Sequence, residues 1–158
     1  MQADFLMEVA ASLKGKVHIA IQTCGYAPTE KFLKVLSVVD YVMYDLKVMD
    51  RALAARYTGC DNRLILENFQ KLSESGVPFV VRVPLIPGVT DTVENLSEIA
   101  ERVQQSAALG VELLPYNKMA GSKYALIGKA YDPLFDEKRE PNIDTAIFCE
   151  KGIAVKVM

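Results

Sequence analysis

The chain has 158 residues, 51% of them hydrophobic and 24% charged, and 18 Lys and Arg against 20 Asp and Glu leave a net charge of −2. This length suffices for one domain with a sizeable core, and we expect a single domain over residues 1–158. The balanced charge argues against nucleic acid or an anionic membrane as a partner, and no apolar stretch approaches the ~20 residues that span a bilayer.

Helical spacing of apolar residues alternates along the chain with short β-rich runs. Helices are predicted at residues 4–13, 29–39, 50–57, 64–75, 91–108 and 143–151. Strands are predicted at residues 17–23, 41–47, 78–86, 111–116 and 153–158, and a long loop at 119–142. Asp91 is interpreted as the N-cap of its helix, with Glu94 three residues later completing a capping box.

This alternation predicts an α/β fold with right-handed crossovers and a parallel sheet. The strands read as apolar on both faces, which is expected of a sheet covered by helices or closed into a barrel.

The cysteines indicate reduced thiols in the cytoplasm, because their number is odd and no secretory signal precedes them. Cys24, Cys60 and Cys149 lie too far apart for a metal-binding spacing, and His18 is the single histidine. A conventional zinc site or a Ser-His-Asp triad therefore cannot be assembled from this sequence.

Polar residues interrupt the apolar strands near their carboxyl ends, where parallel α/β folds build their sites. They are Gln22, Thr23, Asp45, Lys47, Arg82 and Asn117. If the strands are parallel, these residues gather on one rim, and a period of two puts Met43, Asp45 and Lys47 on one face. Buried charges must pair with one another or with a ligand, so the group is either an internal ion-pair network or a binding site.

Five segments at these strand ends carry a family resemblance. They are TCGY at 23–26, YDLKVMD at 44–50, YTG at 57–59, VPLIPGVTD at 83–91 and ELLPY at 112–116. In this order and spacing they resemble the glycyl-radical-enzyme activating enzymes, typified by pyruvate formate-lyase activating enzyme, of the radical S-adenosylmethionine superfamily. The resemblance runs from about Leu13 to Met158.

The resemblance implies part of a (β/α)6 barrel, with about four barrel strands here plus a C-terminal strand. Such enzymes hold a [4Fe–4S] cluster and S-adenosylmethionine, which they cleave reductively. The resulting 5′-deoxyadenosyl radical takes hydrogen from a glycine on a partner enzyme of the pyruvate formate-lyase type, and flavodoxin serves as electron donor.

Carried over by position, Asp45 and Lys47 resemble ribose and carboxylate contacts of S-adenosylmethionine, and Arg82 resembles a further polar contact. Thr23, the Met43 carbonyl and Asp45 resemble parts of a monovalent-cation site. The chemistry suits these roles, since an ammonium meets a carboxylate and a carboxylate accepts hydrogen bonds from ribose.

Two substitutions depart from the family pattern. Gln22 stands where relatives often carry Asp, which removes a negative ligand from the cation site. Asn117 stands where relatives often carry His; it can still hydrogen-bond an adenine edge but stacks poorly.

The family's C-x-x-x-C-x-x-C signature and its Gly-Gly-Glu-like segment are missing from this sequence, which implies that roughly 70 to 90 upstream residues are lacking. Cluster iron needs Cys thiolates at workable spacing, so we expect no cluster and no radical chemistry from this chain alone. The first strand, residues 17–23, would then be an open sheet edge, covered by the N-terminal helix or by a second copy of the chain.

Two other functions remain open on the residues alone. One is a small aldolase-like lyase in which Lys47, its pKa lowered by burial beside Arg82, forms a Schiff base while Asp45 relays protons. The other is a non-catalytic interaction module that keeps the surface for a glycyl-radical partner.

Overall fold

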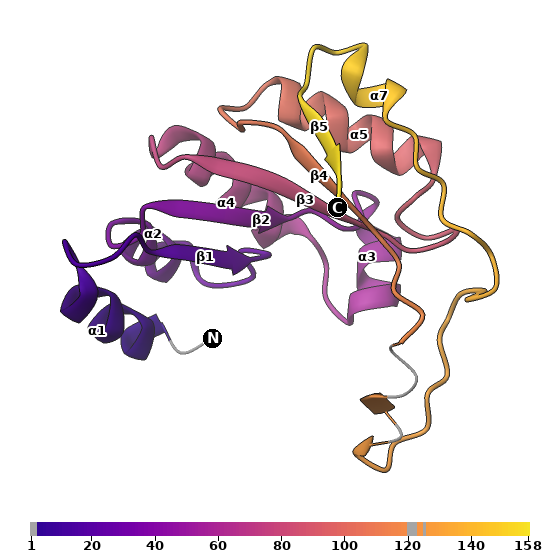
Figure 1. Ribbon diagram of the computed structural model, residues 1–158, viewed down its shortest axis with the longest axis horizontal. Coiled ribbons are helices and arrows are strands. Elements are labelled where there is room, and N and C mark those ends of the chain that lie inside the picture. Colours follow the sequence, from indigo (N-terminus) through magenta and orange to yellow (C-terminus); the bar gives the residue numbers. More distant parts are fainter. Residues whose placement is uncertain (1–2, 120–122, 125) are drawn as a thin grey trace.

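Five parallel strands form one sheet in the computed structural model, which describes residues 3–119, 123–124 and 126–158 (Figure 1). The strands lie in chain order: β1 (Ala20–Thr23), β2 (Tyr41–Asp45), β3 (Phe79–Leu85), β4 (Val111–Pro115) and β5 (Val155–Val157). Each strand is hydrogen-bonded in parallel to the next. This arrangement confirms the predicted α/β fold with four strands followed by a C-terminal one.

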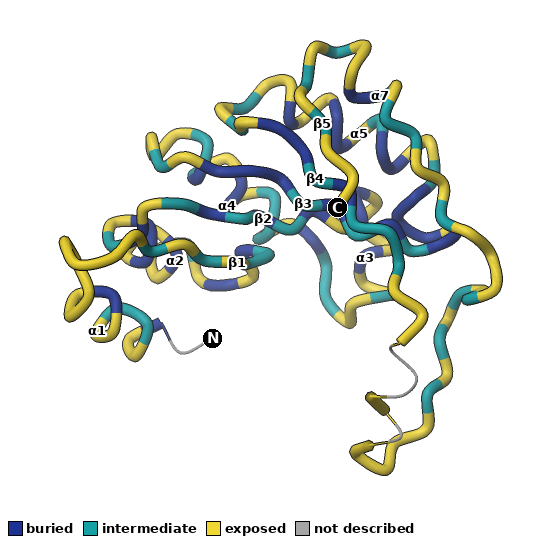
Figure 2. Tube along the Cα trace, viewed as in Figure 1, coloured by how far each residue is buried: buried dark blue, intermediate teal, exposed yellow. Residues whose placement is uncertain are grey.

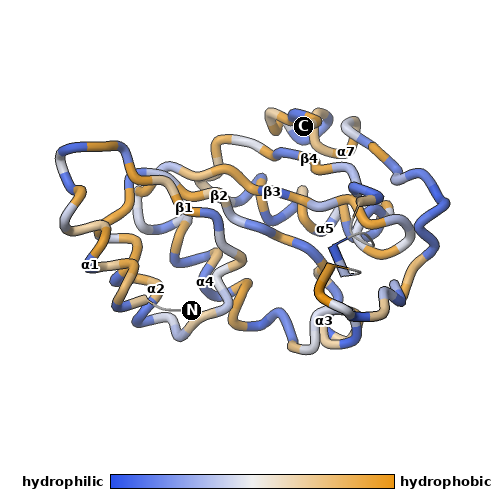
Figure 3. The backbone as a smooth tube through the Cα atoms, turned by 60° about the horizontal axis from the view of Figure 1, so that its bottom comes forward, coloured by the Kyte–Doolittle hydropathy of each residue, from blue (hydrophilic) through white to orange (hydrophobic). Residues whose placement is uncertain are grey.

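Helices connect the strands: α1 (Ala3–Leu13), α2 (Thr29–Leu36), α3 (Arg51–Thr58), α4 (Arg63–Glu74), α5 (Val93–Gln104) and α7 (Ala146–Cys149). Figure 3 shows α1, α2 and α4 together on one side of the sheet. None of the described helices has both the length and the apolar character needed to cross a membrane. Within the predicted loop at 119–142, residues 120–122 and 125 lie outside the described part, and the remainder from 127 onward consists of turns and extended chain.

The core lies between the sheet and the helices, and alternate residues of the three central strands β2, β3 and β4 contribute to it. The fully buried strand residues include Val42, Tyr44, Phe79, Val81, Val83 and Leu113. Tyr44 stands between Phe32 of α2 and Phe69 of α4, with ring centroids 6.1 and 5.7 Å away. Burial raises the pKa of the Tyr44 phenol, whose hydroxyl donates to the Ile65 carbonyl at 2.6 Å.

Helices leave the opposite face of the sheet open, and there apolar residues such as Met43 and Val80 alternate with polar ones, so the expectation of apolar residues on both faces is met only in part. In β2, buried Val42 and Tyr44 alternate with half-buried Tyr41, Met43 and Asp45. Figure 2 shows β3 as largely buried, and half-buried residues interrupt it toward its carboxyl end. Polar side chains placed on this face can therefore meet solvent or a ligand while their neighbours fill the core.

The helix α5 begins one residue later than the predicted capping box implies. Its N-cap is Thr92, whose hydroxyl accepts a hydrogen bond from the Asn95 backbone N–H at 3.2 Å. The Asp91 carboxylate instead accepts from the backbone N–H groups of Gly88 at 2.6 Å and Asn142 at 2.7 Å. Asp91 thus fastens the returning end of the long loop to the start of α5.

Within the described part of the chain, β1 is the edge strand of the sheet, and α1 lies beyond it in the helical layer. This helix packs beside α2 and buries Ala3 and Ala10 (Figures 1 and 3). Phe5 is 64% exposed, and it borders a groove of about 320 Å³ between α1 and β1. The helix therefore extends the helical layer past the sheet and leaves the strand edge unpaired within the sheet.

Candidate functional site

One side chain from each of four neighbouring strands forms a polar row on the open face. These side chains are Gln22, Asp45, Arg82 and Glu112. Gln22 links the row, because its Nε2 donates to Asp45 Oδ1 at 3.3 Å while its Oε1 accepts from Arg82 Nη1 at 2.8 Å. Arg82 Nε lies 3.2 Å from Glu112 Oε2 as an ion pair, although its N–H direction does not meet hydrogen-bond geometry. Asp45 and Arg82 are therefore bridged by the Gln22 amide, and Glu112 balances the charge of Arg82 on the other side.

Sheet register explains why these residues meet. Asp45 pairs with Arg82, and Arg82 pairs with Glu112, so all three side chains point to the same face. Gln22 lies two residues behind them on the same face, opposite Met43, and its longer side chain reaches forward into the row.

Lys47 extends the row beyond the end of β2. Its Nζ lies 3.9 Å from Asp45 Oδ2, and its side chain is 43% exposed, whereas those of Asp45 and Arg82 are 17% exposed. A loosely paired, solvent-facing ammonium next to a half-buried carboxylate can exchange its partner for an anionic ligand at little desolvation cost.

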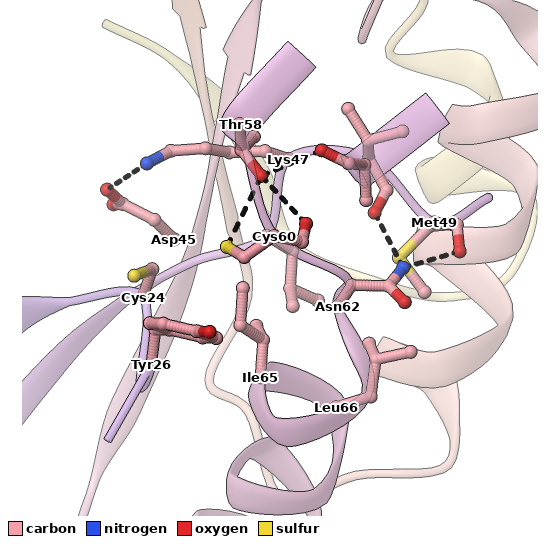
Figure 4. Close-up of a pocket in the computed structure, with 13 residues that line it drawn as sticks. Cys24, Tyr26, Asp45, Lys47, Met49, Thr58, Cys60, Asn62, Ile65 and Leu66 are labelled. Carbon is pink, nitrogen blue, oxygen red and sulfur yellow. Dashed lines mark hydrogen bonds and ion pairs between the residues drawn. The ribbon is translucent and has the colours of Figure 1, made fainter. Parts of the chain in front are cut away.

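A cavity of about 240 Å³ opens beside Asp45 and Lys47 at the carboxyl end of the sheet (Figure 4). Its wall is mostly apolar and comes from the loops after β1 and β2 and from helices α3 and α4. The labelled residues of this wall include Cys24, Tyr26, Met49, Thr58, Cys60, Asn62, Ile65 and Leu66. Few polar groups at the edge of an apolar concavity are typical of small-molecule sites.

The structure brings Asp45, Lys47 and Arg82 together, as the strand-end argument predicts, whereas the side chains of two other candidates bind backbone groups of their own loops. Thr23 faces the helices, because it pairs with buried Tyr44, and its hydroxyl accepts from the Gly25 backbone N–H at 3.0 Å. Asn117 is exposed after β4, and its Oδ1 accepts from the Met119 backbone N–H at 2.9 Å. Thr23 therefore points away from the face that Asp45 and Arg82 share, and the binding roles of Thr23 and Asn117 stay predictions.

Glu112 is a site residue that sequence reasoning missed. The signal was present, since a glutamate interrupts the apolar strand 111–116 in the same way that Arg82 interrupts strand 78–86. Only the register shows that the two charges are opposite each other.

Metal-binding groups are not assembled in the part of the chain that the structure describes: no cluster of three or more His, Cys, Asp or Glu side chains could hold an ion there. Cys24 and Cys60 are partly buried free thiols on the cavity wall, and Cys149 is an exposed free thiol at the end of α7. Of the predicted monovalent-cation set, the Asp45 side chain lies on the open face and the Thr23 side chain on the helix face, while the third member is the backbone carbonyl of Met43 in β2.

Comparison with known proteins agrees with this geometry. The sequence profile of the radical SAM superfamily matches residues 1–103. The trans-4-hydroxy-L-proline dehydratase activating enzyme of Clostridioides difficile is 38% identical over 82% of this chain and 44% of its own length. The (2S)-3-sulfopropanediol sulfolyase activating enzyme of Bilophila wadsworthia is 34% identical over 83% of this chain and 44% of its own length.

The fold has a solved counterpart as well. A crystal structure of a domain of pyruvate-formate lyase-activating enzyme from Bacteroides vulgatus superimposes with a TM-score of 0.77 at 21% sequence identity, covering 99% of this chain and 91% of that one. The chain therefore belongs to the radical SAM superfamily, among the activating enzymes of glycyl-radical enzymes. It spans about half the length of the curated relatives it matches.

Proposed function

We propose that this chain supplies one wall of the S-adenosylmethionine site of a glycyl-radical-enzyme activating enzyme, and that the whole protein generates a glycyl radical on a partner enzyme. The observation that supports this proposal most directly is the polar row on the open face, where Asp45, Lys47 and Arg82 converge beside an apolar cavity.

Each residue of the row offers a group that suits one part of the cofactor. Lys47 offers a solvent-facing ammonium for the methionine carboxylate, and the Asp45 carboxylate can accept hydrogen bonds from the ribose hydroxyls. Arg82 supplies a further polar contact, and its position is fixed on both sides by Gln22 and Glu112. We also propose the finer roles of Asn117 at the adenine edge and of Thr23, Met43 and Asp45 at a monovalent cation.

The residues of this chain do not fit the [4Fe–4S] cluster. Three thiolates at close spacing are needed, and Cys24, Cys60 and Cys149 are dispersed over two loops and the end of a helix. Cleavage of S-adenosylmethionine therefore needs ligands that this chain does not provide, and we propose that the chain alone is inactive.

The partner is proposed at the level of its class. The relatives are named as activating enzymes of a dehydratase, a sulfolyase and a decarboxylase, so a pyruvate formate-lyase-type partner and flavodoxin as electron donor are the finer part of the proposal.

Binding of S-adenosylmethionine to the isolated chain tests the proposed site. We expect Lys47→Met to weaken binding by about tenfold or more, because a hydrogen bond to a charged group contributes about 1.5–3 kcal/mol. Isothermal titration calorimetry, or an NMR titration if binding is weak, measures the affinity.

Lys71→Met is the matched control for this measurement. Lys71 is 44% exposed, close to the 43% of Lys47, but it lies on α4 and pairs with Glu74 at 3.1 Å. Equal affinities of the two variants would contradict the assignment of Lys47.

The Schiff-base lyase receives no support from the geometry. It requires a buried Lys47 beside Arg82, whereas the Lys47 side chain is 43% exposed and pairs with Asp45. The interaction module differs from our proposal in one measurable respect, since it predicts partner binding without any cofactor affinity.

We also propose that the chain by itself associates through the edge of β1. The unpaired strand edge adjoins exposed Phe5, Val9 and Leu13 of α1, which lie four residues apart along one side of the helix. We expect the mass in light scattering to rise with concentration, and Phe5→Glu to suppress this rise. A wild-type mass that stays monomeric at every concentration would contradict the proposal.

A further inference from the structure

The buried polar side chains gather at the carboxyl end of the sheet. Among the described residues they are Asn62, Asn68, Thr90, Asp91 and Asn95, each at most 7% exposed. All five bind backbone groups of the loops that follow β1, β2 and β3. A buried polar group is costly unless it is paired, so this concentration at one end of the molecule needs a reason.

Asn95 holds the segment that carries Lys47. From the first turn of α5, its Nδ2 donates to the carbonyls of Lys47 and Thr90, both at 2.8 Å. Its Oδ1 accepts from the Met49 backbone N–H, also at 2.8 Å. This one side chain therefore satisfies three backbone groups, two of them in the segment after β2.

Asn62 holds the same segment from the other side. It occupies the N-cap position of α4, yet its side chain makes no capping bond there. Its Nδ2 donates instead to the carbonyls of Val48 at 2.9 Å and Met49 at 2.6 Å (Figure 4). The Asn62 side chain therefore stabilises the loop after β2 and does not cap its own helix.

Residues 47–49 need such support because they follow the end of β2, where the hydrogen bonds of the sheet stop. The strand β2 ends at Asp45, and the Leu46 N–H makes its last link to β3, at 3.0 Å to the Arg82 carbonyl. Beyond that point the carbonyls of residues 47–49 are bound by the two asparagine amides.

We propose that Asn62 and Asn95 are positioning residues that fix residues 47–49 so that the Lys47 ammonium faces the carboxylate of its ligand. This inference rests on the proposed S-adenosylmethionine site and adds the device that preorganises it. A group held in place before binding loses less conformational freedom when the ligand arrives.

The test compares two ligands that differ in the amino-acid part. S-adenosylmethionine carries the carboxylate that Lys47 would bind, and 5′-deoxyadenosine lacks it. We expect Asn95→Ala to weaken binding of the first by about tenfold relative to the second, the loss typical of a hydrogen bond to a charged group. Should that variant fail to fold, Asn95→Asp keeps the acceptor for the Met49 N–H and removes both amide donors.

Asn68→Ala is the matched control. Asn68 is also a fully buried asparagine, but its amide donates to the Gly25 and Ala27 carbonyls in the loop after β1. A purely structural role predicts that both variants lower the two affinities in parallel. An unchanged affinity ratio in the Asn95 variants would therefore overturn the inference.

Hydrogen exchange tests the inference independently of the cofactor. We expect amides of residues 46–53 to exchange faster in Asn95→Ala than in Asn68→Ala, after correction for global stability. If the wild-type protein binds neither ligand, the proposal of the cofactor site is wrong. The positioning role is then tested by hydrogen exchange alone. Equal exchange in the two variants would reject that role.

Discussion

Replacing Gly25 by alanine is expected to lower the free energy of unfolding by about 2–5 kcal/mol, the sum of a left-handed backbone cost and an overpacking cost. Gly25 has φ +69°, a conformation that side chains disfavour. A Cβ placed there would lie 2.0 Å from the Tyr44 hydroxyl oxygen and 2.6 Å from its ring carbon Cζ. Tyr44 cannot yield easily, because it is fully buried and its hydroxyl binds the Ile65 carbonyl.

Gly76→Ala separates the two costs. Gly76 has a similar φ of +76°, but nothing lies within 4 Å of the position its Cβ would take. We expect this control to lose only about 1–2 kcal/mol, the backbone cost alone. Chemical denaturation of both variants gives the comparison, and equal losses would show that the contact with Tyr44 is unimportant.

Asp91→Ala is expected to lower the free energy of unfolding by about 3 kcal/mol, since it removes hydrogen bonds to a charged, buried acceptor. Asp91 is 1% exposed, and its loss leaves the backbone N–H groups of Gly88 and Asn142 without their acceptor. Because Asn142 ends the long loop, limited proteolysis within residues 126–142 should also become faster.

Asp136→Ala provides the comparison within the same loop. Asp136 is exposed, and its side chain accepts a turn hydrogen bond from the Lys138 N–H at 2.9 Å. A loss within about 0.5 kcal/mol is expected for such a surface change. If both variants lose the same stability and the same protease resistance, Asp91 does not anchor the loop.

The order and type of the elements could be predicted because they depend on local pattern. Apolar spacing placed each strand within a few residues of its observed bounds, and alternation with helices led to the parallel sheet. The prediction of a capping box at Asp91 was wrong because the Asp91 carboxylate accepts from the backbone N–H of Asn142, which is 51 residues away. Side-chain partners at that distance leave no local signal.

The site could be predicted only in part. Asp45, Lys47 and Arg82 meet because the carboxyl ends of parallel strands align, a rule that needs no coordinates. Strand periodicity also separates Gln22 from Thr23, since successive side chains face opposite sides, and applying it there would have set Thr23 apart. The pairing of Arg82 with Glu112 depends on register, and the roles of Asn62 and Asn95 depend on helix packing.

The two faces of the sheet carry different kinds of side chain. Side chains pointing toward the helices fill the core, whereas those of the polar row are partly exposed and bind one another across neighbouring strands. A substitution in the Gln22, Asp45, Arg82 and Glu112 row should therefore alter ligand binding more, and lower the melting temperature less, than a large-to-small substitution in the core. Binding on one face of the sheet can thus be changed without rebuilding the packing on the other.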